Sequence, residues 1–351
     1  MSRLRVGVLT GGGDAPGLNA AICGLGRRLG EAGAELVGFA DGWRGLIQDR
    51  ALPLDGADFQ HMLIHGGTLL GSSGDNPYRD PARDVPRVLA TLANHRLDAL
   101  VAIGGEGTLG AADRLFREHA VPVVGIPKTI DNDLDATDFT FGFFSAVEVA
   151  TRLMDDLRST AESHSRVMVV ECMGRHAGWI TAYAGVAAGC EGILVPEREA
   201  HLEEVCAQLA KVRAAGATSA LVAAAEGTRV FENGVCLSSQ EKDEFGEYKT
   251  GGVAKLVSHR IQERLGWESR HVVLGHLQRG GRPIAFDRIF ALRLGARAAR
   301  LVLERRFGYM AAMRAGEIVD VPLASAVAKR KVLSDQFLDR YESFFMPIGG
   351  A

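Results

Sequence analysis

Cysteine is sparse in this chain of 351 residues, and its five cysteines show no C-x-x-C spacing. An odd number of widely separated cysteines argues against a disulfide framework and against a zinc site. We therefore expect a protein of the reducing cytoplasm, in which most of these residues are small buried hydrophobes. The cysteines are Cys23, Cys172, Cys190, Cys206 and Cys236.

Long apolar runs and an excess of one charge are also missing. No uninterrupted apolar run approaches the ~20 residues that cross a bilayer. Arg3 and Arg5 are not followed by a long apolar stretch with a small-residue cleavage site, so we expect neither a membrane span nor a signal peptide. The formal net charge of −3 favours binding neither to nucleic acid nor to an anionic membrane surface.

Glycine is abundant, with 43 residues that cluster directly after short apolar runs. These runs, which we expect to be strands, are Leu4–Thr10, Leu36–Ala40, Ala99–Ile103, Val121–Ile126, Val167–Glu171, Gly192–Val195, Ala220–Ala225 and His271–Leu274. Stretches with helical spacing of apolar residues lie between them: Gly17–Ala32, Ala82–His95, Leu109–His119, Phe144–Ala161, Trp179–Ala188 and Leu202–Ala214. This alternation predicts βαβ units with helices on both faces of a parallel sheet.

The length of the chain suggests about two domains. We expect an α/β protein of two doubly wound αβα lobes with mainly parallel sheets and a cleft between the lobes. The first crossing between lobes is expected at Phe141–Phe144, which joins an acidic turn to a long helix. Residues 228–252 are polar and are expected to form a hairpin or surface excursion, with turns at Glu232–Gly234 and Lys242–Gly246.

The most informative stretch is Pro127–Asp133, which follows the apolar run Val121–Ile126. It brings a hydroxyl, an amide and two carboxylates to the carboxyl end of a buried strand, where open α/β sheets bind ligands. One carboxylate there can accept a proton from a substrate hydroxyl, and another can hold a metal ion that carries phosphates. The alternative is an Asp/Asn-rich turn that caps the next helix.

Two glycine-rich turns follow other predicted strands. Gly11–Gly13 precedes a helix, so its main-chain N–H groups and the helix dipole suit an anion such as a phosphate. Gly104–Thr108 admits a phosphate chain, and Glu106 within it is placed to help hold Mg²⁺. The first turn matches neither the P-loop nor the G-x-G-x-x-G pattern. Either turn could instead be a tight βα turn.

A set of cationic side chains follows or precedes the later predicted strands. Arginine is the preferred fork for a phosphate monoester, although a single arginine is usually a solvated surface charge. Glu226 follows another strand, where its carboxylate can accept hydrogen bonds from sugar hydroxyls or cap the turn. Together these residues indicate a sugar-phosphate site: Arg166, Arg175, Arg270, His276 and Arg279.

The order and spacing of these motifs resemble the phosphofructokinase family from about residue 4 to about residue 300. The segments that carry the resemblance are Gly11–Asn19, Gly104–Thr108, Pro127–Asp133, Met173–Gly178 and Gly275–Gly281. The resemblance implies two αβα lobes with a cleft between them. It also implies phosphoryl transfer from ATP or pyrophosphate, with Mg²⁺, to the 1-hydroxyl of fructose 6-phosphate.

The resemblance also implies a role for individual residues. Asp131 is the base, Asp133 and Glu106 serve the magnesium and phosphate centre with Glu106 as the metal ligand, and Arg175 stabilises the transferring group. The sugar phosphate is assigned to Thr129, Asp131, Arg166, Met173, Gly174, Arg175, Glu226, Arg270, His276 and Arg279. The donor is assigned to Gly12, Gly13, Gly74, Arg79, Gly105, Glu106, Gly107, Thr108 and Lys128.

Two positions bear on the donor and give opposite indications. In the family, glycine at Gly107 leaves room for the α-phosphate of ATP, whereas an aspartate there crowds it and favours pyrophosphate. Lys128 resembles the lysine that pyrophosphate users carry. The combination is similar to an actinobacterial ATP-dependent subgroup, and we favour ATP because steric exclusion is the more direct criterion.

Gly74 departs from the family pattern, because most members have an arginine there that bridges the donor and product phosphates. Loss of one charge-assisted contact in a transition state costs ~2–4 kcal/mol, or ~10²–10³ in rate. Arg79 or another cation substitutes, or the enzyme is slow, or the acceptor is another ketose phosphate. Two further hypotheses are pyrophosphate as donor and a catalytically silent regulatory subunit, and the intact Thr129–Asp133 and Met173–Arg175 sets speak against the silent subunit.

The resemblance predicts the domain organisation and the assembly. Residues 1–142 and about 284–330 are expected to form a nucleotide-binding lobe. Residues 143–283 and about 331–351 are expected to form a sugar-phosphate-binding lobe. A homodimer or homotetramer is expected, in which Arg166 and Arg270 reach the site of the neighbouring subunit; the small-molecule partners are ATP and a sugar phosphate.

Overall fold

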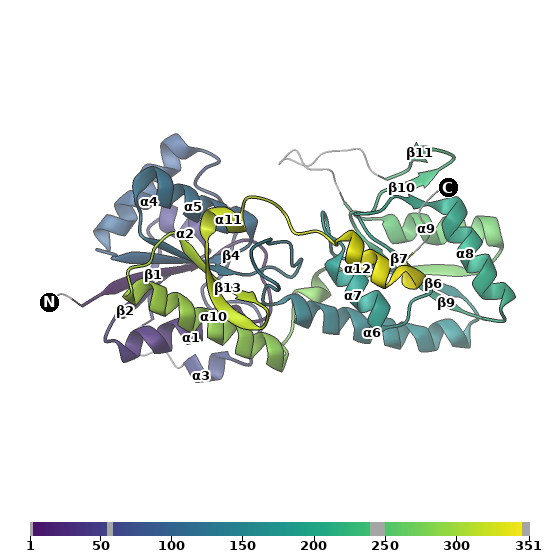
Figure 1. The fold of residues 1–351 in the computed structure, drawn as a ribbon, viewed down its shortest axis with the longest axis horizontal. Coiled ribbons are helices and arrows are strands. Elements are labelled where there is room, and N and C mark those ends of the chain that lie inside the picture. Colours follow the sequence, from purple (N-terminus) through teal and green to yellow (C-terminus); the bar gives the residue numbers. More distant parts are fainter. Residues whose placement is uncertain (1–2, 55–58, 239–249, 346–351) are drawn as a thin grey trace. The chain divides into compact units, whose positions relative to one another are not determined.

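The computed structural model describes residues 3–54, 59–238 and 250–345. The chain divides into two compact units that are each built from separate stretches of sequence (Figure 1). Unit 1 comprises Met1–Ile130, Leu134–Ser145 and Arg279–Arg330. Unit 2 comprises Asp131–Asp133, Ala146–Gln278 and Lys331–Ala351. The long crossing therefore falls after Ser145, at the start of a helix, and residues 279–283 belong to unit 1.

Unit 1 is built on a seven-stranded sheet in the order β14-β13-β5-β4-β1-β2-β3. Its parallel strands are β1 (Arg5–Thr10), β2 (Glu35–Phe39), β4 (Ala99–Gly104), β5 (Val123–Pro127) and β13 (Tyr309–Arg314). Antiparallel strands cover both edges, namely β3 (Ala51–Pro53) and β14 (Glu317–Pro322). Because β2 and β4 lie on opposite sides of β1, the strand order reverses between β1 and β4, which is where doubly wound sheets bind ligands.

Helices cover both faces of this sheet, because alternate strand residues point to opposite sides. Val6 and Val8 contribute to one core with α1 (Leu18–Glu31) and α10 (Ala285–Leu303). Leu100 and Ala102 contribute to the other core. The helices of that second core are α2 (Trp43–Ile47), α4 (Pro81–Asn94), α5 (Glu106–His119) and α11 (Leu323–Ala326), while the short α3 (Phe59–Met62) lies against α1.

Unit 2 contains a smaller, wholly parallel sheet in the order β12-β6-β9-β7. Its strands are β6 (Val167–Cys172), β7 (Gly192–Leu194), β9 (Ala220–Ala225) and β12 (Ser269–Val273). One face packs on α8 (Leu202–Ala214) and α9 (Val253–Leu265), and α7 (Trp179–Ala187) contacts β7 and β9. Other elements are α6 (Phe143–Ser163), whose first three residues belong to unit 1, β8 (Ala200–His201), the short helix η1 (Gly275–Gln278), α12 (Asp335–Arg340) and η2 (Glu342–Phe344).

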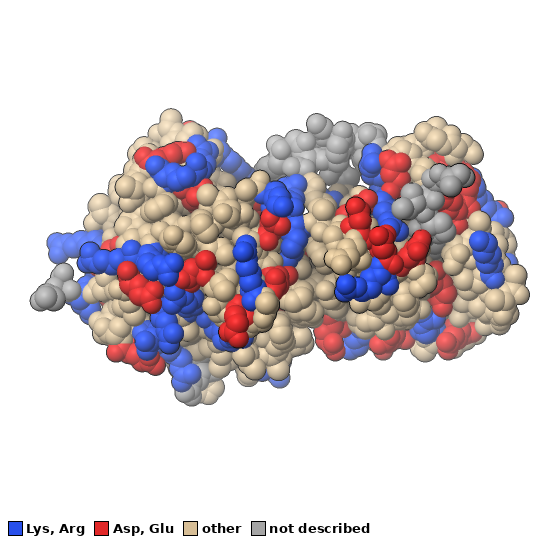
Figure 2. Space-filling model, viewed as in Figure 1, with Lys and Arg blue, Asp and Glu red and all other residues tan. Residues whose placement is uncertain are grey.

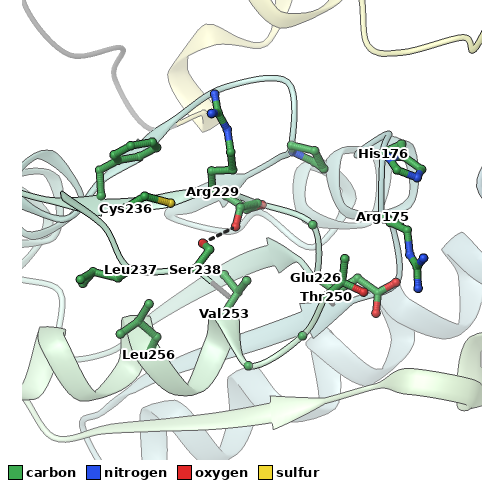
Figure 3. A pocket seen from close by; sticks show the side chains of 16 residues that line it. Arg175, His176, Glu226, Arg229, Cys236, Leu237, Ser238, Thr250, Val253 and Leu256 are labelled. Atoms are coloured by element: carbon green, nitrogen blue, oxygen red, sulfur yellow. Dashed lines mark hydrogen bonds between the residues drawn. The ribbon is translucent and has the colours of Figure 1, made fainter. Parts of the chain in front are cut away.

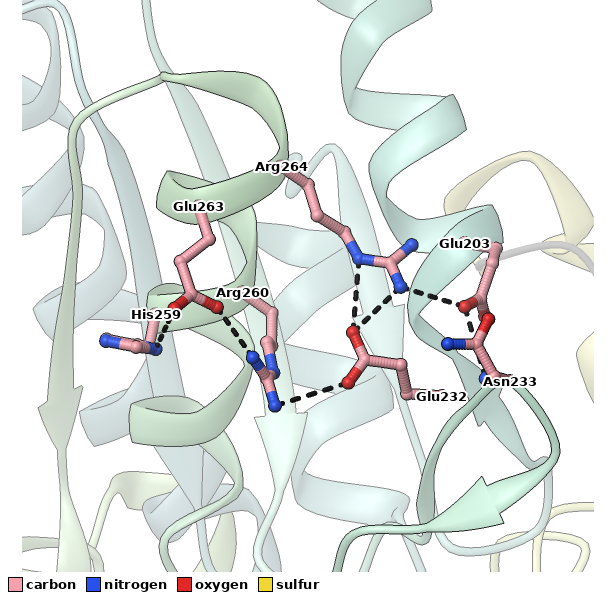
Figure 4. A network of polar contacts seen from close by, with 7 residues as sticks. All are labelled: Glu203, Glu232, Asn233, His259, Arg260, Glu263 and Arg264. Atoms are coloured by element: carbon pink, nitrogen blue, oxygen red, sulfur yellow. Dashed lines mark hydrogen bonds and ion pairs between the residues drawn. The ribbon is translucent and has the colours of Figure 1, made fainter.

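A small hairpin in unit 2 confirms part of the excursion expected at residues 228–252. Strands β10 (Val230–Glu232) and β11 (Val235–Cys236) pair in antiparallel fashion around a turn at Asn233 and Gly234. Glu232 at the turn accepts from Arg260 at 3.2 Å and from Arg264 at 2.8 Å, which ties the hairpin to α9 (Figure 4). The second expected turn, Lys242–Gly246, lies outside the described residues.

The expected α/β class is confirmed, since both principal sheets are mainly parallel and carry helices. The strands and helices expected up to residue 274 are present, with ends that differ by a few residues. Among the elements that were not predicted from the sequence are α10, β13 and β14, which complete unit 1 from the C-terminal part of the chain.

Acidic and basic side chains are interspersed on the face shown in Figure 2, in keeping with the small net charge. Within the described ranges, none of the helices combines the length and apolarity that a bilayer crossing requires.

Candidate active site

Two glycine turns of unit 1 meet at the point where the strand order reverses. Gly11 N–H donates to the carbonyl of Ile103 at 2.9 Å, which joins the end of β1 to the end of β4. Thr108 fills the space between the turns: a Cβ at Gly11 would lie 2.6 Å from its Oγ1, and a Cβ at Gly104 2.3 Å from its Cβ. Glycine is therefore required at both positions, and Gly12, Gly13, Gly105 and Thr108 are brought together as predicted for a donor site.

The segment that contains Gly74 is tied to both turns. Ser72 Oγ donates to the carbonyl of Gly12 at 2.6 Å, and Gly12 N–H donates to Ser73 O at 2.9 Å. Asn76 Nδ2 donates to the carbonyl of Gly107 at 3.3 Å. Open space surrounds Gly74 and Gly107, since a Cβ at either position would meet no atom within 4 Å.

Arg79 belongs to the same segment. Its main-chain N–H donates to Asn76 O at 3.1 Å, so it lies one turn beyond the residue that contacts Gly107.

Two buried or half-buried cations flank the Gly12–Gly13 turn. Lys128, at the end of β5, is only 3% exposed, and its Nζ donates to the carbonyl of Gly13 at 2.5 Å. A Cβ at Gly13 would lie 2.3 Å from Nη1 of Arg279, so this guanidinium rests against the turn. Among the described residues, Nε of Arg279 is buried and has no hydrogen-bond partner. Such an arrangement suits a bound anion.

Arg279 thus lies in unit 1 beside the predicted donor turn, whereas most of the other residues assigned to the sugar phosphate belong to unit 2. His276 follows β12 in unit 2, within η1. Both residues were assigned to one sugar-phosphate set through the family resemblance of the segment Gly275–Gly281.

Glu106 is the first residue of α5, and its Oε2 accepts from Nε of Arg330 at 3.0 Å. Within the described part of the chain, no three His, Cys, Asp or Glu side chains converge as a metal cage. Mg²⁺ that is bound with a nucleotide does not require such a cage, since one or two carboxylates act together with phosphate oxygens and water. Glu106 fits this role because its carboxylate is exposed, beside the glycine turn.

The acidic turn after β5 is shared between the units. Thr129 belongs to unit 1, where its carbonyl accepts from Thr140 Oγ1 at 2.7 Å, and Asp131–Asp133 belongs to unit 2. Asn132 is fully buried in a left-handed conformation with φ of 52°. Lys331 holds this turn, since its N–H donates to Asp133 O at 2.8 Å and its Nζ donates to Asn132 Oδ1 at 2.9 Å.

In unit 2 the carboxyl ends of β6 and β9 are joined. Glu226 N–H donates to Cys172 O at 2.9 Å, and Gly227 N–H donates to Gly174 O at 3.2 Å. A Cβ at Gly227 would lie 2.0 Å from the carbonyl oxygen of Arg175, so only glycine permits this approach. Arg175 and Glu226 consequently line one cavity of about 550 Å³, as predicted for groups that bind one ligand (Figure 3).

Buried acidic and thiol groups support these strand ends. Glu171, 3% exposed, accepts from the N–H groups of Gly252 and Ala254 at 3.1 and 2.9 Å and so caps α9. Burial raises the pKa of the Cys172 thiol well above its usual range, which keeps it neutral beside Met173. Glu171 and Cys172 therefore support the strand ends structurally, and the neutral thiol of Cys172 is not a nucleophile.

Comparison with known proteins identifies the family to which this arrangement belongs. A family model described as phosphofructokinase matches residues 5–302. The chain belongs to the phosphofructokinase family.

Close relatives of the chain in this family carry two kinds of name. A pyrophosphate–fructose 6-phosphate 1-phosphotransferase of Amycolatopsis methanolica is 49% identical over 343 residues, which cover 97% of this chain and 100% of the relative. ATP-dependent 6-phosphofructokinase 3 of Streptomyces coelicolor is 46% identical over 334 residues, covering 95% and 97% of the two chains. Homology at this level therefore leaves the phosphoryl donor open.

Solved structures of the family share the fold. Phosphofructokinase from Saccharomyces cerevisiae is 29% identical with a TM-score of 0.80, and the match covers 93% of this chain but 45% of the longer yeast chain. A pyrophosphate-dependent phosphofructokinase from Nitrosospira multiformis has a TM-score of 0.84 at 20% identity, covering 98% and 89% of the two chains. The second match shows the fold alone.

Two arginines assigned to the sugar phosphate lie at the amino ends of strands in the sheet of unit 2, opposite the carboxyl ends that carry Arg175 and Glu226. Arg166 immediately precedes β6, and Arg270 is the second residue of β12; both pair with Glu268, at 3.4 and 2.9 Å. The six residues of β6 span about 20 Å, so Arg166 is far from Met173 of the same unit. The structure does not bring these arginines to the cavity of their own chain.

Basic residues near the end of the chain were not predicted to act at the site. Arg330 pairs with Glu106, and Lys331 holds the acidic turn. The run Lys329–Lys331 was the available signal, but it lies beyond residue 300, where the family resemblance ended.

Proposed function

We propose that this chain transfers a phosphoryl group from MgATP to the 1-hydroxyl of fructose 6-phosphate, giving fructose 1,6-bisphosphate. The observation that carries the choice of donor is the open space at Gly107, the second residue of α5. A donor longer than pyrophosphate has room there. Lys128 supports binding of its phosphates, because its ammonium lies against the Gly12–Gly13 turn.

In this proposal Asp131 accepts the proton of the attacking hydroxyl, and Thr129 orients the sugar. Arg175 neutralises charge that develops on the transferring group, where electrostatic help lowers the barrier most. Glu106 and Asp133 would hold Mg²⁺, which supplies neutralisation of the donor phosphates.

The sugar phosphate is proposed to bind through Met173, Gly174, Glu226, His276 and Arg279. Arg166 and Arg270 are proposed to act on the neighbouring subunit of a homodimer or homotetramer. Arg166 precedes β6 and Arg270 lies at the start of β12, whereas Met173 follows β6. This separation within one chain supports the assignment. We further propose that the enzyme acts in the cytoplasm.

Pyrophosphate as donor is the second candidate, and Lys128 is the observation that favours it. Its ammonium lies beside the glycine turn, where a short anion would be within its reach. Another ketose phosphate as acceptor is favoured by Gly74, where the family arginine is absent.

A matrix of donors and acceptors tests the proposal. Purified protein with Mg²⁺ is assayed with ATP and pyrophosphate, each against fructose 6-phosphate, sedoheptulose 7-phosphate and an epimeric ketose 6-phosphate. We expect the highest kcat/KM for ATP with fructose 6-phosphate. A much better pair elsewhere in the matrix would overturn the choice of donor or acceptor.

The proposed base is tested by Asp131→Asn, which keeps the size of the side chain and removes its proton affinity. We expect kcat to fall about 10³-fold while fructose 6-phosphate still binds. Asp135→Asn is the matched control, because Asp135 is a nearby carboxylate that pairs with Lys329 at 3.2 Å. Turnover by Asp131→Asn at the control's rate would refute the assignment.

A further inference from the structure

Lys331, the first residue of the C-terminal segment of unit 2, contacts the acidic turn. Lys331 makes two contacts with it, by its main-chain N–H to Asp133 O at 2.8 Å and by its Nζ to Asn132 Oδ1 at 2.9 Å. The first contact is available to any residue except proline. The second requires a long cationic or hydrogen-bonding side chain.

Lys331 is itself held by the start of α7. Trp179 Nε1 donates to the carbonyl of Lys331 at 3.0 Å, and Nζ of Lys331 lies 5.6 Å from the centre of the Trp179 indole. Trp179 directly follows the Met173–Gly178 loop, which carries Arg175. Lys331 therefore connects the turn that carries the proposed base to the loop that carries the proposed transition-state arginine.

The neighbouring residues secure this connection at its other side. Glu197 accepts from Leu333 N–H at 2.9 Å and from Gly178 N–H at 3.0 Å, so the same carboxylate joins the C-terminal segment to the end of the loop. Phe337 of α12 packs on Trp179, with ring centres 5.6 Å apart. The segment is thus anchored on α7 whether or not the lysine side chain is present.

We propose that Lys331 is a positioning residue for phosphoryl transfer, whose ammonium holds the Asp131–Asp133 turn in its reactive conformation. This inference rests on the proposed function, because it takes Asp131 as the base. The physical reason is the left-handed backbone of Asn132, which is less favourable for asparagine than for glycine and which a contact to its side chain helps to hold.

A positioning role predicts a loss in kcat without a matching loss in substrate affinity, since misplacement of a reacting group acts on the transition state. Lys331→Met keeps the main-chain contacts and much of the side-chain volume. We expect its kcat to fall 10- to 100-fold, with KM for both substrates within threefold of the unaltered protein. Lys331→Arg is expected to recover most of the lost rate, because it restores a cationic donor.

Lys329→Met is the matched control. Lys329 is a lysine two positions away whose side chain is 73% exposed and pairs with Asp135, so its loss removes the same charge without touching the turn. We expect its kcat and KM to stay unchanged. Thermal unfolding of all variants is measured alongside, and Lys331→Met is expected to unfold within a few degrees of the control.

Two results overturn the inference while leaving the proposed function intact. The first is an unchanged kcat in Lys331→Met. The second is an equal loss of kcat in Lys331→Met and Lys331→Arg that parallels a loss of folded protein. Failure of the proposed function gives a different result, namely no phosphoryl transfer by the unaltered protein in the donor and acceptor matrix. Butylammonium added to Lys331→Ala provides a second measurement. Partial rescue of kcat by butylammonium supports the positioning role. Full activity of Lys331→Ala without butylammonium contradicts it.

Discussion

Replacing Gly107 with aspartate tests the reasoning about the donor most directly. A Cβ at this position meets no atom within 4 Å, so the side chain fits without displacing its surroundings. Gly107 is the second residue of α5, where a carboxylate interacts favourably with the helix dipole and glycine is a poor helix former. We therefore expect the variant to be as stable as the unaltered protein, or more stable by about 0.5–1 kcal/mol.

The effect on catalysis follows from the added charge. A carboxylate about 5 Å from a phosphate oxygen, at an effective dielectric constant of about 20, raises the energy of a bound donor by about 3 kcal/mol. That energy corresponds to roughly 200-fold in kcat/KM for ATP. Pyrophosphate lacks the third phosphate, so its kcat/KM is expected to fall much less, and the ratio of the two donors should shift toward pyrophosphate.

The assay is steady-state kinetics with each donor at saturating fructose 6-phosphate. Gly107→Asn is the matched control, because it adds the same volume without the charge and separates steric crowding from repulsion. An ATP kcat/KM within about threefold of the unaltered protein in Gly107→Asp would refute the reasoning. A loss of equal size for both donors would show that the residue does not discriminate between them.

Three further predictions concern the rest of the chain. Gly74→Arg should raise kcat/KM about tenfold or more if a missing phosphate contact limits the rate, since a Cβ at Gly74 meets no atom within 4 Å; an unchanged rate beside a Gly74→Ala control would exclude that explanation. Gly295→Ala should destabilise unit 1 by about 1–3 kcal/mol in urea unfolding, because its Cβ would lie 2.1 Å from Ala21 O in the α1–α10 contact. The control Gly30→Ala lies in open space on α1 and should be neutral or stabilising. Asp320→Asn should cost about 2 kcal/mol at pH 7, because hydrogen bonds from Arg297 hold the pKa of Asp320 below its usual value. That contribution to the free energy of unfolding is present above about pH 4 and is lost as the pH falls through the lowered pKa. The difference in stability between Asp320→Asn and the unaltered protein should therefore shrink in unfolding curves below about pH 4. A difference that stays constant would contradict this prediction.

Much of the fold could be predicted because its signals are local. The apolar strands, the glycine turns after them and the helical spacing between them each lie within a short stretch of sequence. The edge strands β3 and β14 were not predicted, since whether a strand pairs in antiparallel fashion depends on which neighbour it meets. The helix α10 belongs to unit 1 although it follows the whole of unit 2, and no local pattern shows that return.

The candidate site divides in the same way. Residues that follow strands directly, such as Gly12, Glu226 and Arg175, were placed at strand ends by the sequence, and the structure has them there. Arg279 and His276 were grouped through the family resemblance, and the sequence did not show that the chain changes units between them.

What the sequence by itself determined is the order of the strands and helices and the chemistry carried at each strand end, because both depend on neighbouring residues. What only the tertiary structure decided is which distant groups meet: Lys128 and Arg279 at the Gly12–Gly13 turn, and Lys331 at the acidic turn. Those contacts join residues more than a hundred positions apart. They exist because strand ends converge at one edge of each sheet, and packing of the whole chain determines which side chains reach that edge.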